Sequence, residues 1–295
     1  MALKDLFNSY FYGRPGKADF TERDLPANRL QLFKDVLLVR KGSMVGLNFL
    51  YLLPWLPAAI WTFINAVQLP GIISGNLGWK PEELLFTYLL VLFPLIAITG
   101  PFRIGVSYVM RNWARDEHSF PFLDFKKAMK ENWKQALLFS IIEGALPLLV
   151  YICVFFYSGM AQGSAIFYLP IAVVLLAAIL WNLSAQLIPT LIVTYEIKFP
   201  HIVKNAVLMT LAALPKAILA KLATLALPIL LLLLALFIPS ALSWAGALVL
   251  TLYLVFMLSF NKLVTASYAN MVCEKYLNTK IEGAQVNIGL HPKDD

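Results

Sequence analysis

Charged residues inside apolar segments are the first candidates for chemistry in this chain. Arg103, Glu143 and Lys262 each interrupt a long apolar segment, and Lys221 lies near the start of another. A charge at bilayer depth costs roughly 3 kcal/mol on insertion scales, so such a group usually faces protein or water and has a partner. Because Glu143 is the one acid among them, we expect it to lie between the cations Arg103 and Lys262.

Uncharged polar residues extend this candidate cluster. Thr99, Gln186 and Ser259 each precede a tyrosine by nine residues, and Asn182 lies one helical turn before Gln186 on the same face. These groups could form a polar chamber, opening toward the cytoplasm, for a small polar or anionic solute. The alternative is that they only fix helix packing, through a buried ion pair and hydrogen bonds worth about 1 kcal/mol each.

Catalytic and metal-binding patterns are scarce. "SFNK", from Ser259 to Lys262, fits the S-x-x-K pattern of Ser-Lys acyl enzymes, but a match of four residues arises by chance and no second motif supports it. Three histidines are present and do not cluster: His118, His201 and His291. We therefore expect no catalytic residue, no metal site, no cofactor and no enzymatic activity.

Composition determines the class of protein. Of 295 residues, 60% are hydrophobic and only 14% are charged, a balance that cannot cover the surface of a soluble domain. A transmembrane helix needs about 20 apolar residues. On that basis we predict an all-α membrane protein with six spans: 44–67, 84–110, 136–157, 165–193, 216–237 and 242–271.

The distribution of Lys and Arg predicts the orientation of these spans. The turns expected on one side of the membrane contain one of the 24 Lys and Arg residues, namely Lys80. Cytoplasmic segments retain positive charge, so both termini are predicted to be cytoplasmic. No cleavable signal peptide is expected at the polar N-terminus. The net charge of +7 favours anionic lipid headgroups as partners over nucleic acid.

Landmarks recur three times along the chain. A proline lies in each odd span, at Pro54, Pro147 and Pro228, and an amphipathic stretch precedes each of these spans. Parallel helix-hairpin repeats would produce this pattern, with quasi-threefold packing about the membrane normal. Chance alignment of apolar sequence is the alternative. The predicted organisation is a cytoplasmic arm at 1–27, a membrane domain at 28–278 with repeats at 28–115, 121–198 and 201–278, and a cytoplasmic tail at 279–295.

One of these amphipathic stretches is strongly basic. Its aromatic and sulfur-containing residues share one side of a predicted helix: Phe122, Phe125, Met129 and Trp133. Its lysines share the other side: Lys126, Lys127, Lys130 and Lys134. Such a helix is expected to rest in the headgroup layer with its aromatic side down, which makes the lysines a candidate surface for lipid or a partner protein.

The same region resembles a known family. "GPFRIGVSYVMRNWARDE" followed by "FLDFKKAMKENWKQALL" is similar to the YesL family of bacterial membrane proteins of unknown function, over residues 99–138. The resemblance implies that the protein lies in the plasma membrane of a bacterium. Members are often encoded beside carbohydrate importers, so it also implies an accessory or regulatory role, with a carbohydrate importer or another membrane protein as partner. A transporter or channel acting through the polar chamber is the alternative function, and a membrane-embedded enzyme is the third.

Overall fold

The described residues of this chain are all helices, turns and loops. The structure is a computed structural model that describes residues 25–75 and 78–291, and no strand occurs among them. Most of the predicted arm at 1–27, and the last four residues of the tail, lie outside the described residues. Six helical segments are long and apolar enough to cross a membrane, which confirms the predicted number of spans: Arg29–Ile73, Pro81–Ile98, Trp133–Ala161, Ala165–Ser184, Leu214–Phe237 and Leu242–Lys280.

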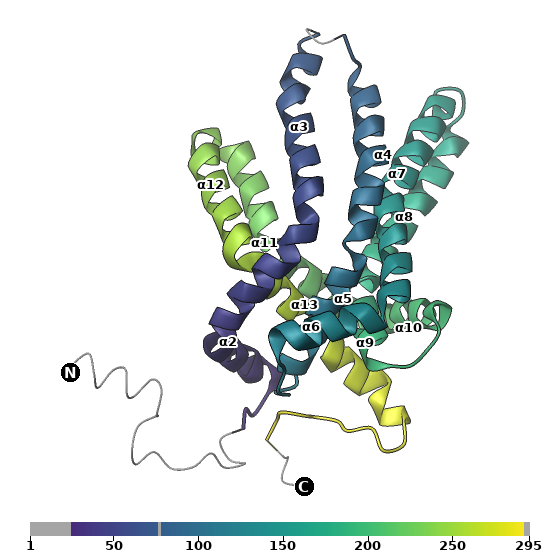
Figure 1. Cartoon of the computed structure of the whole chain (residues 1–295). Helices are drawn as coiled ribbons and strands as arrows, with labels where there is room; N and C mark the ends of the chain where they lie inside the picture. Colours follow the sequence, from purple (N-terminus) through teal and green to yellow (C-terminus); the bar gives the residue numbers. More distant parts are fainter. Residues whose placement is uncertain (1–24, 76–77, 292–295) are drawn as a thin grey trace, which may run out of the picture.

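The helices form three hairpins that project from one side of a helical base (Figure 1). The hairpins pair α3 (Leu56–Ile73) with α4 (Pro81–Ile98), α7 (Trp133–Ala161) with α8 (Tyr168–Ser184), and α11 (Leu214–Phe237) with α12 (Leu242–Leu252). The base contains α2 (Arg29–Leu52), α5 (Gly100–Trp113), α6 (Pro121–Glu131), α9 (Ile188–Thr194), α10 (Phe199–Ala212) and α13 (Leu258–Tyr276). Short turns complete the chain: η2 (Leu53–Trp55), η3 (Ala165–Phe167), η4 (Pro239–Ala241) and η6 (Asn278–Lys280).

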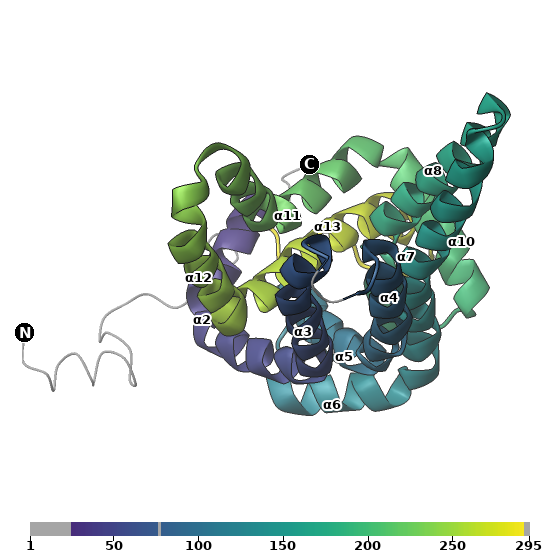
Figure 2. The ribbon, with the colours of Figure 1, turned by 90° about the horizontal axis from the view of Figure 1, so that it is seen from above.

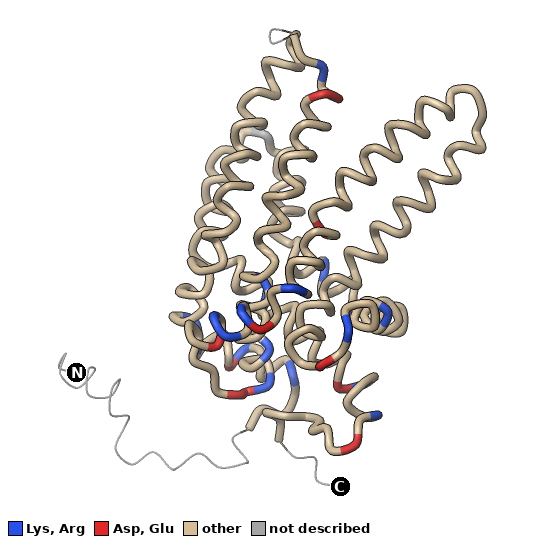
Figure 3. Tube along the Cα trace, turned by 45° about the vertical axis from the view of Figure 1, so that its right-hand side comes forward, with Lys and Arg blue, Asp and Glu red and all other residues tan. Residues whose placement is uncertain are grey.

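Polar and apolar surfaces are divided between base and hairpins. Charged residues gather on the base, apart from a few at one hairpin tip and inside the molecule (Figure 3). Large apolar side chains on the hairpins point outward, and Phe63, Leu176 and Phe237 are 69%, 67% and 78% exposed. Such a surface fits lipid, because an apolar area of this extent is not stable in water. The chain is therefore a multi-pass membrane protein.

The hairpins are not packed alike. Seen from above, α4 lies against α7, whereas α11 and α12 stand apart from α3 (Figure 2). The α4–α7 contact extends along both helices, since Tyr151 near one end donates to the Glu82 carbonyl at 2.9 Å and Gly144 lies against Phe93. Above the base, α12 packs on its own segment, α11. The hairpins therefore make unequal contacts with one another, and the predicted quasi-threefold packing is not confirmed.

The returning helix of each hairpin is interrupted where it meets the base. We predicted continuous spans at 84–110, 165–193 and 242–271; the first two were wrong, whereas 242–271 lies within the helical segment Leu242–Lys280, whose regular α-helix alone is interrupted. α4 stops at Ile98 and α5 starts at Gly100, α8 stops at Ser184 and α9 starts at Ile188, and α12 passes into a π-helix, η5 (Tyr253–Met257). Proline in the first turn of α5 and of α9 explains two of the breaks, because proline lacks the amide hydrogen that a continuous helix needs.

The first amphipathic stretch also differs from expectation. Residues 28–43 are not a separate interfacial helix, because α2 runs without interruption from Arg29 to Leu52 and bends into α3 at η2, which contains Pro54. The second and third stretches do form separate helices, α6 and α10. α6 does not rest with its whole aromatic side on the headgroups, since Phe125 is buried against Gly105 of α5. Phe122 and Trp133 remain about half exposed.

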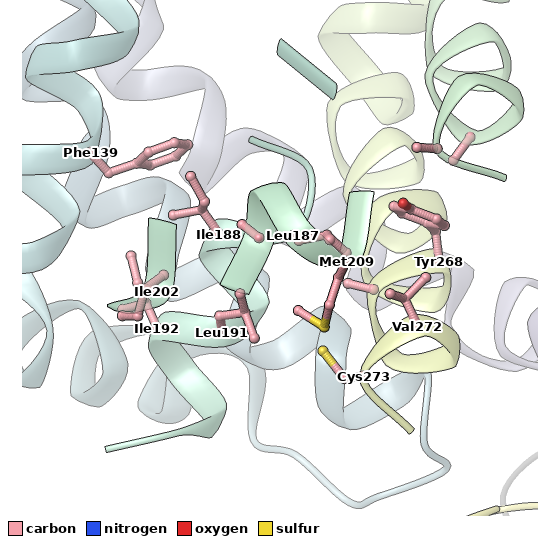
Figure 4. Packing of buried hydrophobic residues seen from close by; sticks show 14 of the residues in the cluster. Phe139, Leu187, Ile188, Leu191, Ile192, Ile202, Met209, Tyr268, Val272 and Cys273 are labelled. Atoms are coloured by element: carbon pink, nitrogen blue, oxygen red, sulfur yellow. The ribbon is translucent and has the colours of Figure 1, made fainter. Parts of the chain in front are cut away.

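The base has a tightly packed interior. Side chains from α7, α9, α10 and α13 meet in one cluster, where Phe139, Leu191 and Ile202 have no exposed surface (Figure 4). A second cluster places α5 against α2 and α13 and buries Met44, Met110 and Leu263 completely. This interior holds α5 and α13 in fixed positions beneath the hairpins.

Glycine lets α5 approach α7 closely. A Cβ atom at Gly100 would lie 2.4 Å from the Ala136 carbonyl oxygen and 2.5 Å from Ser140 Oγ. We expect Gly100→Ala to destabilise the protein by about 1–3 kcal/mol, because backbone atoms must move apart. Unfolding of the purified protein in detergent measures this. Gly46→Ala is the control, since no atom lies within 4 Å of that position; an equal loss in both variants would contradict the argument.

Candidate functional site

A polar cavity lies where the second and third hairpins meet the base. This chamber has a volume of about 340 Å³ and is bounded by α7, α8 and α11 of these hairpins and by α2, α5 and α13 of the base. Polar and charged side chains provide much of its wall: Tyr51, Arg103, Glu143, Asn182, Gln186, Lys221, Thr224, Asn261, Lys262 and Thr265. Five of the seven residues that we proposed as a cluster from the sequence are among them.

Glu143 of α7 holds two donors from neighbouring helices. Arg103 Nη1 donates to Glu143 Oε2 at 3.2 Å, and Trp181 Nε1 of α8 donates to Glu143 Oε1 at 2.7 Å. The guanidinium carbon of Arg103 lies 5.1 Å from the centroid of the Phe139 ring. Through these two hydrogen bonds Glu143 links α7 to α5 and to α8 at the wall of the chamber.

The other two cations lack a carboxylate partner. Among the described residues neither Lys221 nor Lys262 forms an ion pair. Lys262 Nζ instead lies 5.4 Å from the centroid of the Tyr51 ring. The expectation that Glu143 pairs with both Arg103 and Lys262 was therefore wrong for Lys262. The wall contains three cationic side chains and one carboxylate, a balance of 3 − 1 = +2.

The chamber is closed on the side of the base. One turn below the wall, Ser107, Thr190 and Ala266 are at most 5% exposed, and the cavity that they line measures only about 20 Å³. On the hairpin side the wall reaches Leu225, which is 38% exposed. The expected opening of the chamber toward the cytoplasm stays a prediction.

Two residues of the proposed cluster lie outside the wall. Thr99 has no exposed surface, and its hydroxyl donates to the carbonyl of Ile96, three residues earlier in the chain, at 2.8 Å. Ser259 is also fully buried, and its Oγ has no hydrogen-bond partner. Both residues lie at helix interruptions, where close helix contacts turn their side chains away from the chamber. The S-x-x-K hydroxyl therefore makes no hydrogen bond with Lys262.

Asn48 of α2 stabilises the third interruption. Its Nδ2 donates to the carbonyls of Tyr253 and Leu254 at 3.0 and 2.8 Å, and its Oδ1 accepts from the Ser259 amide at 3.1 Å. A π-helix disturbs the regular hydrogen bonds of a helix, and a side chain that inserts there can satisfy the freed groups. Asn48 thus holds the helix that places Asn261 and Lys262 in the wall.

Several wall residues were absent from the cluster proposed from the sequence. Lys221, Thr224, Asn261 and Thr265 are polar residues within otherwise apolar spans, and that signal was available. Tyr51 gave no comparable signal, because aromatic residues are common in spans. Asn48 is a lone amide in an apolar segment, so its burial could have been expected, but its partners could not.

A second polar cavity lies in the base and has a different character. It measures about 660 Å³, and its charged lining residues are Glu131, Glu196 and Lys198. Beside it Tyr195 donates its hydroxyl hydrogen to Asn278 Oδ1 at 2.6 Å. Burial, with a smaller contribution from Cys273, raises the pKa of Tyr195, so the hydroxyl keeps this hydrogen. Its mixed charges make this cavity a weaker candidate for a specific ligand.

The basic residues of α6, together with Lys134 in the first turn of α7, lie on the surface of the base. Lys126, Lys127, Lys130 and Lys134 are all exposed. Lys134 Nζ lies 5.7 Å from the centroid of the Trp133 ring, and none of the four forms an ion pair among the described residues. No group of three residues able to hold a metal ion occurs in the part of the chain that the structure describes.

Comparison with known proteins gives one match, to part of the chain. No curated protein and no solved structure matches it. The model of one family, described as "Protein of unknown function, DUF624", matches residues 82–154. This segment runs from α4 into α7 and contains both Arg103 and Glu143. Over these residues, which include one complete ion pair of the chamber wall, the chain is similar to the DUF624 family.

Proposed function

We propose that this protein is a non-enzymatic membrane protein that binds a small anionic solute in the chamber and carries it across the membrane. The observation that supports this proposal is the excess of cationic side chains around a cavity among apolar spans. Unpaired charges within spans are costly, and a cavity whose wall has an excess of one sign of charge attracts ligands of the other sign. Helix packing alone would need the Arg103–Glu143 pair but gives no reason for Lys221 and Lys262.

Uptake by proteoliposomes tests this function. We expect the wild type to accumulate at least one of the anions sulfate, phosphate and succinate, and Lys262→Gln to reduce its initial rate by roughly tenfold or more, since one charge contact is lost. Lys216→Gln is the matched control, because Lys216 is exposed in the first turn of α11, outside the chamber. Absence of uptake for every anion, in protein shown to be folded, would rule out transport of this class.

A second candidate function is accessory or regulatory. The exposed lysines of α6 and Lys134 at the start of α7 favour it, together with the resemblance to the YesL family, whose members are often encoded beside carbohydrate importers. In this function the lysines bind anionic headgroups or a carbohydrate importer. Purification from native membranes in mild detergent tests it, with a variant carrying Gln at all four lysines as the comparison. A partner recovered equally well with both proteins would contradict a role for α6.

Both functions use the same orientation, with the N- and C-termini in the cytoplasm of a bacterium. The concentration of charge on the base supports this orientation (Figure 3). The three interruptions at equivalent places support an internal repeat, with each break near the residue nine positions before a tyrosine.

Cysteine labelling measures the orientation. In a background with Cys153 and Cys273 replaced by alanine, we expect Ser74→Cys to react with an impermeant maleimide added to intact cells. His118→Cys should react only after the membrane is opened. Both positions are exposed, so burial does not prevent the reaction. The reverse pattern would place the base outside the cell.

A further inference from the structure

The charges of the chamber wall indicate how many negative charges its ligand carries. Glu143 pairs with Arg103 at 3.2 Å, and this pair contributes no net charge. Lys221 and Lys262 then remain without a carboxylate among the described residues. A ligand with one negative charge would leave one of these cations unbalanced in a site surrounded by apolar spans, which is unfavourable.

From this balance we infer that the ligand is a compact oxyanion with two negative charges, held between Lys221, Lys262 and the Arg103 side of the wall. The inference rests on the proposed function and specifies its substrate class. The cavity of about 340 Å³ is at the lower end of the range for small-molecule sites, about 300–1,000 Å³, so the ligand must be small.

Neutral donors around the cations suit the oxygens of such an anion. Amide and hydroxyl groups line the same wall: Asn182, Gln186, Asn261, Thr224 and Thr265. Arg103 is 9% exposed, and its Nε is buried and has no hydrogen-bond partner. An oxyanion accepts hydrogen bonds at every oxygen, whereas a halide offers no such directional acceptors.

Glu143 acts in this arrangement as an internal counterion. It orients Arg103 through one hydrogen bond and keeps the net charge of the wall at +2 instead of +3. Removing its charge while keeping an acceptor oxygen, as in Glu143→Gln, should therefore strengthen the binding of a dianion. Removing a lysine should weaken that binding and reduce the preference for two charges.

Isothermal titration of the purified full-length protein in detergent tests these expectations, with sulfate and methanesulfonate as probes of similar size and different charge. At constant ionic strength we expect the wild type to bind sulfate roughly tenfold more tightly than methanesulfonate, or better. Glu143→Gln should raise the affinity for sulfate, and Lys221→Gln should bring the two affinities closer together. Lys216→Gln should match the wild type.

The possible outcomes test the dianion inference, the anion site and the role of Glu143 separately. Equal affinities for the two anions in the wild type would overturn the dianion inference and leave the proposed anion site intact. No binding of either anion would overturn both. An unchanged affinity for sulfate in Glu143→Gln would show that Glu143 does not affect the preference for two charges. If Glu143→Gln does not fold, Lys221→Gln still decides the question, because Lys221 makes no ion pair whose loss would destabilise the protein.

Discussion

Replacing Glu143 with alanine is expected to destabilise the protein by about 3–5 kcal/mol, because it leaves a buried cation without its carboxylate. Arg103 is the cation concerned, and the side chains of Arg103 and Glu143 are 11% and 18% exposed. Trp181 Nε1 also loses its acceptor. Denaturant unfolding in detergent measures the change. Glu131→Ala is the control and should change stability by less than about 0.5 kcal/mol, since this residue is exposed on α6.

A double-mutant cycle separates the partners of Glu143. Arg103→Leu combined with Glu143→Leu should be less harmful than the sum of the single changes by about 0.5–3 kcal/mol, because neither charge remains alone. Lys262→Leu combined with Glu143→Leu should be closer to additive, since no ion pair joins these residues. Strict additivity for Arg103 and Glu143 would contradict the pairing.

Replacing Asn48 with leucine is the second change for which we expect a large loss. The substitution leaves two carbonyls and one amide of the third interruption without their side-chain partner. An unsatisfied buried polar group costs about 1–3 kcal/mol, so a total loss of about 3 kcal/mol or more is expected in the same unfolding measurement. Sulfate binding should weaken as well, because η5 and α13 position Asn261 and Lys262 in the chamber wall.

Asn65→Leu is the matched control for this substitution. Asn65 is 7% exposed, but its Nδ2 donates only to the Trp61 carbonyl of its own helix, at 2.8 Å. That carbonyl also belongs to the regular hydrogen bonds of α3, so little should be lost. Equal destabilisation by both substitutions would show that burial of the amide, and not the interruption, determines the effect.

The sequence predicted the spans and the polar residues better than their arrangement. Hydropathy and length are properties of single segments, and they identified six spans and the charges within them. The interruptions were missed because Pro101 and Pro189 can begin a new helix or kink an existing one, and the sequence does not distinguish the two. The π-helix depends on Asn48, which lies more than 200 residues away in the chain.

The sequence also did not distinguish the two possible cationic partners of Glu143. Equivalent depths made Arg103 and Lys262 equally good partners for Glu143, but depth does not specify the rotation of a helix. Gly100 determines that rotation in part, since it brings the first turn of α5 onto α7 and directs Arg103 toward Glu143. Thr99 was misplaced for the same reason.

The third hairpin, which contacts the second mainly where α11 meets α8, is less closely packed than the first two, and it forms part of the chamber wall. α11 contributes Lys221 and Thr224 to the wall, while above the base α12 packs on its own segment and not along another hairpin. Because the third hairpin has few contacts with the other two, a bilayer of different hydrocarbon thickness is expected to change its tilt. Such a change of tilt would alter the separation between Lys221 and the Arg103–Glu143 pair. If the chamber binds an anion as we propose, its affinity should therefore depend on membrane thickness.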